Sequence, residues 1–360
     1  MSGNKQITLY KQPLAPRTWV ALVLWAWLVF CIPALFITSL MALALGMEPF
    51  EGVLYLLLSI ALAWSFASFL VSVPFGLFVW RNYSQENLRK LDYAATRVVR
   101  LWKRFPLPRD PVYSTFLSTL AFVRSCLGRM DESCKLYYEA LAVMSKPRYK
   151  RMAYPHLATV LNNIAGIHSR EHNFDEANRL LDQSLAIWEA QKGREKNGAA
   201  IPYTNKAHIL IEQGQLDEAE KLLLKARSLY EDPEQPRLIV QDTVKQARII
   251  CLLELVDLSC RKGKPAEARS YVEEALGVIA SVSVPPGPQL LRSLNSASAS
   301  LLALEEVDVC ARLLAMAYDI GRLFPDHPDA QRTLEVFEGL LTKTSRQSEI
   351  SDMKRWLLPV

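Results

Sequence analysis

The sequence predicts an all-α protein in which a two-helix transmembrane hairpin is followed by an α-solenoid of helical pairs. Three observations lead to this fold class. Glycine accounts for only 14 of the 360 residues, so glycine-rich phosphate loops and many tight β turns are not expected. Two long apolar runs near the N-terminus contain no charged residue. After them, one pattern of large and small side chains recurs every 42 to 49 residues.

The two apolar runs cover residues 19–45 and 53–80. Each is longer than the roughly 20 residues that a helix needs to cross about 30 Å of hydrocarbon. The link from Gly46 to Glu51 contains two glutamates and no cation, so the runs are expected to form a tight hairpin. A cleaved signal peptide is the alternative, because "ALA" at 42–44 resembles a cleavage site. The first run is too long for a signal peptide, and a second run follows at once.

Cations flank the hairpin on both sides. They are Lys5, Lys11 and Arg17 in the tail of residues 1–18, and Arg81, Arg89 and Lys90 after the second run. Because such residues are retained on the cytoplasmic side, we expect an integral membrane protein with two spans whose termini and solenoid are cytoplasmic. Residues 1–104 hold ten Lys/Arg against four Asp/Glu, and the remainder holds 32 against 33. The solenoid therefore lacks the positive charge of a nucleic-acid-binding protein.

Residues 84–105 form a predicted juxtamembrane helix. Its apolar residues recur three and four apart, which places them on one stripe; they are Leu88, Leu91, Ala95, Val98, Trp102 and Phe105. Cations surround the stripe at Arg89, Lys90, Arg97, Arg100, Lys103 and Arg104. The helix either lies on anionic lipid headgroups or packs its stripe on the next helical pair and caps the array. Three prolines between residues 106 and 111 end it.

The repeat is anchored on a small residue near the start of every second helix. The anchors are Ser133, Ala177, Ala219, Ala268 and Cys310, at spacings of 44, 42, 49 and 42. Large residues stand sixteen before and four after each anchor, and a small residue stands seven after it. Two antiparallel helices approach closely when large side chains face small ones in this way. Gly128, Gly214 and Gly263 stand five before their anchors, where the first helix is expected to stop in a left-handed cap.

This pattern resembles the tetratricopeptide repeat, and "LATVLNNIAGIHSREHNFDEANRLLDQSLAIWE" is similar to the longer version of that repeat in kinesin light chains. HEAT and armadillo arrays share the period, but the Gly/Asp-Glu-Ala turn favours tetratricopeptide helices. The resemblance extends over about residues 112–322. It implies a solenoid over residues 112–344 that ends in a capping helix, followed by a tail at 345–360. His172 and Glu305 depart from the pattern because they replace the turn glycine.

A possible metal motif, H-x-x-E-H, occurs at His168, Glu171 and His172. On one continuous helix it would place two imidazoles one turn apart, as in the inverzincin zinc motif. The repeat register instead places His172 in a turn, so a zinc enzyme is kept only as an alternative. No nucleophile constellation, Walker loop or G-x-S-x-G motif is present in the sequence, and no cofactor or catalytic residue is expected.

Polar residues stand fourteen before each anchor on otherwise apolar first helices. They are Thr119, Asn163, Asn205, Glu254 and Ser296. In tetratricopeptide arrays the first helices line the concave surface, so the resemblance implies that asparagines here bind the backbone of an extended peptide. The predicted groove residues are Asn163, Asn205, Asn162, Thr159, Thr204, His208, Asp257 and Arg261. The alternative is that Asn162 and Asn163 satisfy neighbouring helix ends. The predicted groove residues lack the cluster of Lys and Arg that would bind a C-terminal carboxylate.

These observations predict a membrane-anchored scaffold that recruits a protein or peptide to the cytoplasmic membrane surface through its concave groove. Lipid, with anionic headgroups, is the second expected partner, and nucleic acid is not expected. The same scaffold facing the periplasm or a lumen is an alternative, as is the membrane metalloenzyme. The six cysteines show no CxxC motif, so they read as buried thiols of a reducing compartment.

Overall fold

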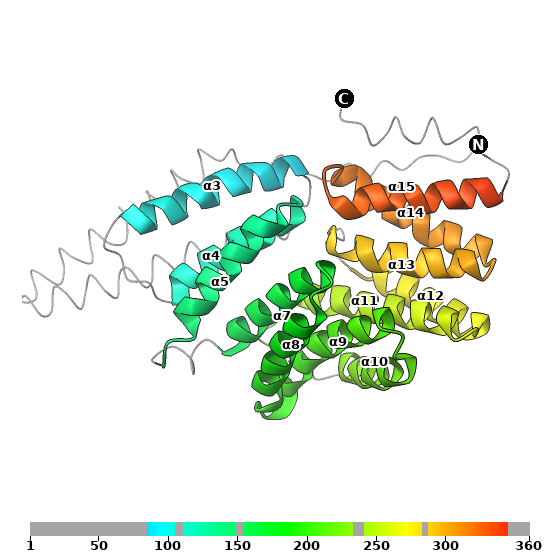
Figure 1. The fold of residues 1–360 in the computed structure, drawn as a ribbon, viewed down its shortest axis with the longest axis horizontal. Coiled ribbons are helices and arrows are strands. Elements are labelled where there is room, and N and C mark those ends of the chain that lie inside the picture. The colour runs from blue at the N-terminus through cyan, green and yellow to red at the C-terminus, as the bar shows by residue number, and fades with distance from the viewer. Residues whose placement is uncertain (1–84, 105–110, 148–153, 233–240, 283–286, 345–360) are drawn as a thin grey trace, which may run out of the picture. The chain divides into compact units, whose positions relative to one another are not determined.

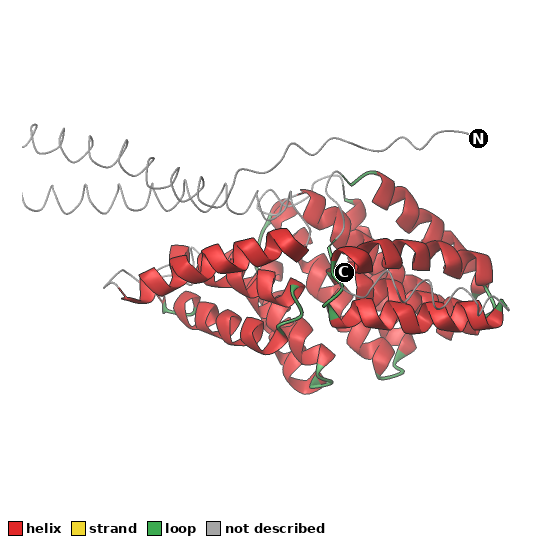
Figure 2. Ribbon diagram, turned by 90° about the horizontal axis from the view of Figure 1, so that it is seen from above, coloured by secondary structure: helices red, strands yellow, loops and turns green. Residues whose placement is uncertain are grey.

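The computed structural model describes residues 85–104, 111–147, 154–232, 241–282 and 287–344. Within these ranges the chain is helical and contains no strand (Figures 1 and 2). None of the helices so described is long and apolar enough to cross a membrane. The expected spans at 19–45 and 53–80 lie outside the described residues, as do the two tails.

The helices pair in sequence. In chain order they are α3 (Gln85–Arg104), α4 (Pro111–Cys126), α5 (Met130–Met144), α7 (Tyr154–Arg170), α8 (Phe174–Glu189), the short 3-10 helix η1 (Gly193–Ala199), α9 (Ala200–Glu212), α10 (Leu216–Glu231), α11 (Gln241–Arg261), α12 (Pro265–Ala280), α13 (Gln289–Ala303), α14 (Val307–Leu323) and α15 (Pro328–Lys343). The pairs are α4/α5, α7/α8, α9/α10, α11/α12 and α13/α14, each joined by a short turn (Figure 1). This part of the chain is an all-α solenoid of repeated helical pairs, as predicted.

Every pair turns through one residue in the left-handed region. Gly128, Gly214 and Gly263 have φ of 76°, 77° and 69°, and His172 and Glu305 have φ of 56° and 63° at the equivalent place. In each turn the next amide donates back to a carbonyl of the first helix, as from Gln215 N to Leu210 O at 2.8 Å. These bonds satisfy the carbonyls that a helix end leaves free. The predicted left-handed cap is confirmed, and in the two turns that lack the glycine a His or a Glu adopts it.

The small residues let the two helices of a pair interlock. The residues seven positions after the anchors have no exposed surface; they are Ala140, Ser184, Ala226, Ala275 and Ala317. Ser184 also donates from its hydroxyl to the Ala158 carbonyl at 2.9 Å, so its polar group is satisfied inside the pair. The predicted facing of large and small residues is therefore present in every repeat.

Helix α3 caps the first pair with its apolar stripe. Leu88, Leu91, Ala95 and Trp102 are buried, and the Trp102 ring lies 5.7 Å from that of Tyr113 on α4. Val99 is buried in place of the predicted Val98, because both valines lie near the stripe and only packing distinguishes them. The packed stripe agrees with the expectation that this helix caps the array.

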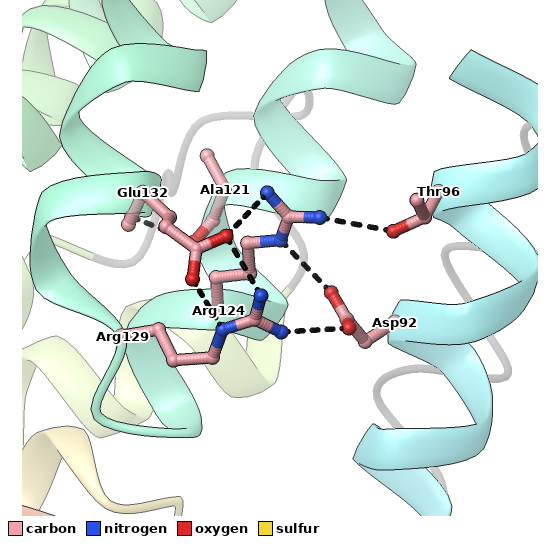
Figure 3. Close-up of polar contacts among 7 residues, drawn as sticks. Asp92, Thr96, Ala121, Arg124, Arg129 and Glu132 are labelled. Carbon is pink, nitrogen blue, oxygen red and sulfur yellow. Dashed lines mark hydrogen bonds and ion pairs between the residues drawn. The ribbon is translucent and has the colours of Figure 1, made fainter. Parts of the chain in front are cut away.

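An ion-pair cluster joins α3 to the turn between α4 and α5 (Figure 3). Asp92 accepts from Arg124 Nε at 2.9 Å and from Arg129 at 2.8 Å through its two carboxylate oxygens. Glu132 accepts two bonds from Arg129, both at 2.7 Å. One carboxylate of α3 thus positions the arginines on either side of the Gly128 turn.

The first repeat also contacts the segment that leads from the last pair into the closing helix α15. We call this the closure contact: the turn at Gly128 lies against the segment Asp326–Asp329, which leads into α15. A Cβ added at Gly128 would lie 3.0 Å from Pro328 Cδ and 3.1 Å from the Asp326 carbonyl oxygen. Beside it, Arg170 on α7 forms an ion pair with Asp329 at 2.7 Å. Repeats that are remote in sequence are therefore held together at this contact.

Gly128→Ala is expected to destabilise the chain more than Gly214→Ala, its matched control. Both glycines have the same positive φ, which costs an alanine about 1–2 kcal/mol, but a Cβ at Gly214 meets nothing within 4 Å. The crowding at Gly128 adds about 1–3 kcal/mol. Thermal unfolding of the full-length chain in detergent, followed by circular dichroism, measures both variants. If the unfolding midpoint falls equally in the two variants, the closure contact contributes nothing to stability.

Acid is expected to weaken the start of α15. Burial lowers the pKa of His327 to about 4, Asp329 raises it in part, and the nearby charge of Arg170 lowers it further. The neutral Nδ1 caps α15 by accepting from the Asp329 amide at 3.2 Å. Because the unfolded chain binds this proton near pH 6.5 and the folded chain only near pH 4, stability falls as the pH drops through that window, by an amount on the order of 3 kcal/mol.

His327→Asn supplies an uncharged N-cap acceptor and is expected to flatten the pH dependence of the unfolding midpoint between pH 6.5 and 4. His172→Asn is the control, because His172 is exposed in a turn and asparagine tolerates its positive φ. If the His327→Asn chain keeps the slope of the wild type, the capping role assigned to His327 is wrong.

Candidate functional site

The first helices of the pairs lie together on one side of the solenoid. Packing contacts join α7 to α9, α9 to α11, α11 to α13 and α13 to α15, whereas no contact of comparable extent joins α8, α10 and α12 to one another within the described chain. Successive first helices are therefore closer than successive second helices. We call the surface that they form the inner face.

Asparagines on the first helices α7 and α9 link neighbouring repeats, one to the second helix α5 and the other to the first helix α7. Asn163 donates from Nδ2 to the Tyr137 hydroxyl at 3.0 Å, and Asn205 donates to Asn162 Oδ1 at 2.8 Å. Both asparagines are half-buried. The partners are side chains of the preceding repeat rather than helix ends. Each amide has two donor hydrogens and an acceptor oxygen, so each keeps capacity for a further hydrogen bond.

A buried histidine–glutamate pair lies in the middle of the inner face. His208 Nδ1 on α9 is 2.9 Å from Glu254 Oε2 on α11, and Ser293 on α13 donates to Glu254 Oε1 at 2.7 Å. Burial raises the pKa of Glu254, but the charge and hydrogen bond of His208 outweigh that effect, and the pKa is lowered overall. Glu254 is therefore a carboxylate at neutral pH. It binds three successive first helices together.

Other predicted groove residues serve the structure. Asp257 is fully buried and accepts from Arg261 Nε at 3.1 Å and from Ser296 at 3.2 Å. Thr204 is 2% exposed and donates to the Ala200 carbonyl at 2.9 Å. These two side chains cannot reach a ligand, and their assignment to the groove is corrected. Thr159 is exposed, and its hydroxyl donates to the Pro155 carbonyl at 2.8 Å.

Arg261 bridges helices rather than standing free. Its guanidinium donates to the Ile211 carbonyl at 3.2 Å and to Glu212 at 3.3 Å, both on α9. Burial lowers the pKa of Arg261, but the charge and hydrogen bond of Asp257 more than offset this. Arg261 remains a cation that ties α11 to the end of α9, and 37% of its side chain is exposed.

Two arginines that the sequence reasoning missed also belong to this surface. Arg170, at the end of α7, pairs with Asp329 of α15. Arg292, on α13 beside Ser293, is half-buried, and burial and the charge of Arg170 both lower its pKa, while Glu254, Asp329 and Glu212 raise it. The two arginines occupy different positions in their repeats, so the repeat register gives no sign that they meet.

The H-x-x-E-H sequence does not have the geometry of a zinc helix. Helix α7 ends at Arg170, and His172 lies in the left-handed turn beyond it. His168 Nε2 is instead 2.8 Å from the Tyr138 hydroxyl. In the described part of the chain, no group of three or more His, Cys, Asp or Glu residues is placed to hold a metal ion.

The six cations of the predicted membrane surface lie along α3. Arg89 pairs with Asp326 at 2.6 Å, and Lys103 pairs with Glu139 at 2.7 Å. Arg97 lies over the Tyr93 ring, 4.7 Å from its centroid. Lys90, Arg100 and Arg104 are exposed as well. The basic residues thus flank a buried stripe, and at least two of them pair with carboxylates of the solenoid.

The family comparison agrees with the predicted repeat. Residues 156–232 match the family described as Tetratricopeptide repeat. No curated protein matches the chain. Among solved structures, similar folds include BtubC from P. vanneervenii (16% identity, 75% of this chain and 92% of that chain, TM-score 0.44) and a Rap protein complexed with Competence and Sporulation Factor (15% identity, 95% and 98%, TM-score 0.49). A Podosopora anserina kinesin light chain structure with nearly identical TPR-like repeats shares 18% identity over 55% of this chain and 91% of that chain, with a TM-score of 0.41.

The family match begins within α7 and ends just after α10, so it covers the second and third pairs. The same left-handed turn and the same buried small residues occur in the pairs on either side. Residues 156–232 are therefore matched as tetratricopeptide repeats, and they lie within a longer array of TPR-like helical pairs.

Proposed function

We propose that this chain is a membrane-anchored scaffold whose inner face binds an extended segment of a partner protein. The observation that carries the proposal is the pair of half-buried amides of Asn163 and Asn205, which lie on the successive first helices α7 and α9. Each amide can form a further hydrogen bond beyond the one described. Amides in such a row match the repeating N–H and C=O groups of an extended peptide. Such a scaffold would act by holding its partner at one place and raising the partner's effective concentration there, and it would catalyse no reaction.

The membrane part of the proposal rests on the sequence before α3. Residues 19–45 and 53–80 are uncharged and long enough to span, and α3 follows them closely. The exposed cations of α3 would add attraction to anionic headgroups, about 1 kcal/mol for each cation near the surface. In this arrangement α3 caps the solenoid with one side and faces the bilayer with the other.

The flanking cations favour a cytoplasmic solenoid with both termini on the same side. A solenoid that faces the periplasm or a lumen is the competing arrangement. In the two arrangements the repeats lie on opposite sides of the membrane. The side from which a reagent can label a thiol in the solenoid therefore distinguishes them.

Replacing Asn163 and Asn205 together by Ala is expected to reduce the affinity for the partner about five- to 150-fold, while the helicity and membrane residence of the full-length chain stay unchanged. Two lost amide contacts, each about 0.5–1.5 kcal/mol, account for that reduction. The measurement is affinity capture from solubilised membranes, with quantification of the co-purifying chains.

Tyr137→Phe is the matched control for this pair of substitutions. It removes the hydroxyl that Asn163 contacts and leaves the amide in place, so it reproduces the structural change without removing the ligand contact. Capture that survives in the asparagine double variant would refute the groove assignment. Equal losses in both variants would assign the asparagines a structural role only.

Cys134 is the thiol suited to a test of topology, because it is half-buried whereas Cys126, Cys251, Cys260 and Cys310 are buried. A membrane-impermeant maleimide is expected to label it only after the cells are permeabilised. Burial, Glu171 and Asp131 raise the pKa of this thiol, so labelling requires mildly alkaline buffer. The Cys134→Ser chain gives the background. Labelling of intact cells above that background would place the solenoid on the opposite side.

A further inference from the structure

Two of the steps between successive first helices are bridged by the same repeat position. The residue eleven before the anchor is His208 on α9 and Asp257 on α11. His208 Nδ1 lies 2.9 Å from Glu254 Oε2. Asp257 Oδ2 accepts from the Ser296 hydroxyl at 3.2 Å. Both residues that are reached stand fourteen before the next anchor, so this position forms a bridge from one first helix to the following one.

The step from α7 to α9 lacks this bridge. Its residue eleven before the anchor is Gly166, which has no side chain to extend toward α9. A Cβ added at Gly166 would meet nothing within 4 Å. The residue that a bridge would reach is Asn205, and its amide donates instead to Asn162, one turn earlier on α7, at 2.8 Å. We call the open place beside Gly166 and Asn205 the notch.

Packing does not account for the glycine. In the middle of a helix, glycine is less favourable than alanine, and no neighbouring atom at Gly166 would crowd a methyl group. Glycine at such a place leaves room for another group to approach the helix backbone closely. The notch is therefore open toward the inner face without a structural need for it.

A histidine nitrogen without a partner is directed at the notch from α9. His208 is 8% exposed, and its Nε2 is buried and has no hydrogen-bond partner among the described residues. Because Nδ1 is directed at Glu254 on α11, Nε2, on the other side of the ring, is directed back toward α7. First helices run in the same direction, so one turn beyond the bond between Asn205 and Asn162 His208 lies at the level of Gly166.

The notch has one hydrogen-bond acceptor and one donor. Glu254 is a carboxylate and can only accept, so the hydrogen of the neutral imidazole is on Nδ1 and the lone pair is on Nε2. Asn205 keeps a second Nδ2 hydrogen beyond the one that it gives to Asn162. A ligand group that donates to His208 and accepts from Asn205 would satisfy both.

A primary carboxamide has this chemistry. Its nitrogen donates and its oxygen accepts, and the two are separate atoms, whereas a hydroxyl has one oxygen for both bonds. A carboxylate has no hydrogen for Nε2 and would be repelled by the charge of Glu254 behind the imidazole. An aliphatic side chain would fill the notch but leave Nε2 buried without a partner, which costs free energy.

We propose that the notch binds the side-chain carboxamide of an Asn or Gln in the partner segment. Its NH2 group donates to His208 Nε2, and its oxygen accepts from Asn205 Nδ2. The bound amide takes the place of the bridging side chain that Gly166 lacks. This inference rests on the peptide-binding function above and specifies one side chain of the bound segment.

Four pools of fluorescent heptapeptides test the chemistry of the notch. Each pool has an amidated C-terminus and a central Gln, Asn, Glu or Met, and the other positions are random among residues without a carboxamide or carboxylate. Fluorescence anisotropy with the full-length chain in detergent measures the apparent affinity of each pool. We expect the Gln or the Asn pool to bind about five- to 150-fold more tightly than the Glu and Met pools, as for two hydrogen bonds.

Gly166→Leu fills the notch and is expected to remove this preference, and Gly166→Ala is expected to weaken it. Gly277→Leu is the matched control, because Gly277 lies within the second helix α12 and the place of its Cβ is open as well. All three substitutions replace a helix glycine at an open place, so the thermal midpoint is expected to stay or rise. If Gly166→Leu lowers the midpoint, Gly166→Ala decides.

The outcomes separate this inference from the function on which it rests. If all four pools bind alike, if the Glu or Met pool binds most tightly, or if the filled notch keeps the preference for a carboxamide, the peptide groove stands and the carboxamide site is overturned. If no pool binds, both the groove and the carboxamide site are overturned.

Discussion

The left-handed turn between the two helices of each pair is the constraint on which the rest of the solenoid depends. It reverses the chain within a few residues, and it sets the first and second helices at the distance where small residues meet large ones. All five turns adopt it, three with glycine and two with His172 and Glu305. The two exceptions accept a backbone strain of roughly 1–2 kcal/mol because the caps and the packed helices on both sides determine the conformation.

The Gly128 turn has a second role that the other turns lack. At Gly214 and Gly263 the place of a Cβ is open, so glycine serves the backbone alone, whereas at Gly128 the segment entering α15 fills that place. Asp92 and the arginines beside the turn fix it from the side of α3. The cap at the start of the array and the helix at its end are thus coupled through one turn. A repeat array usually has contacts only between neighbours, so this coupling makes the two ends interdependent.

The sequence predicted the parts of this structure that depend on local pattern. The helical pairs, the turn positions and the buried small residues follow from register, and the same register correctly identified Asn163 and Asn205 as polar positions on first helices. It chose Val98 where Val99 is buried, because adjacent valines satisfy a stripe equally well. It could not find the partners of those polar residues. Asn205 with Asn162, and His208 with Glu254, are more than 40 residues apart, and their meeting depends on how successive pairs are rotated.

Arg170 and Arg292 show the same limit more strongly. Nothing in a repeat pattern relates the end of α7 to the first turn of α13 or to the first turn of α15, yet the closure contact and the Arg170–Asp329 pair hold these elements around one place. Glu254, Asp329 and Glu212 act on Arg292 from three other helices, and Arg261 joins Asp257 to Glu212. These charges meet only after the helical pairs have stacked, so a pattern within one repeat cannot predict which of them become partners.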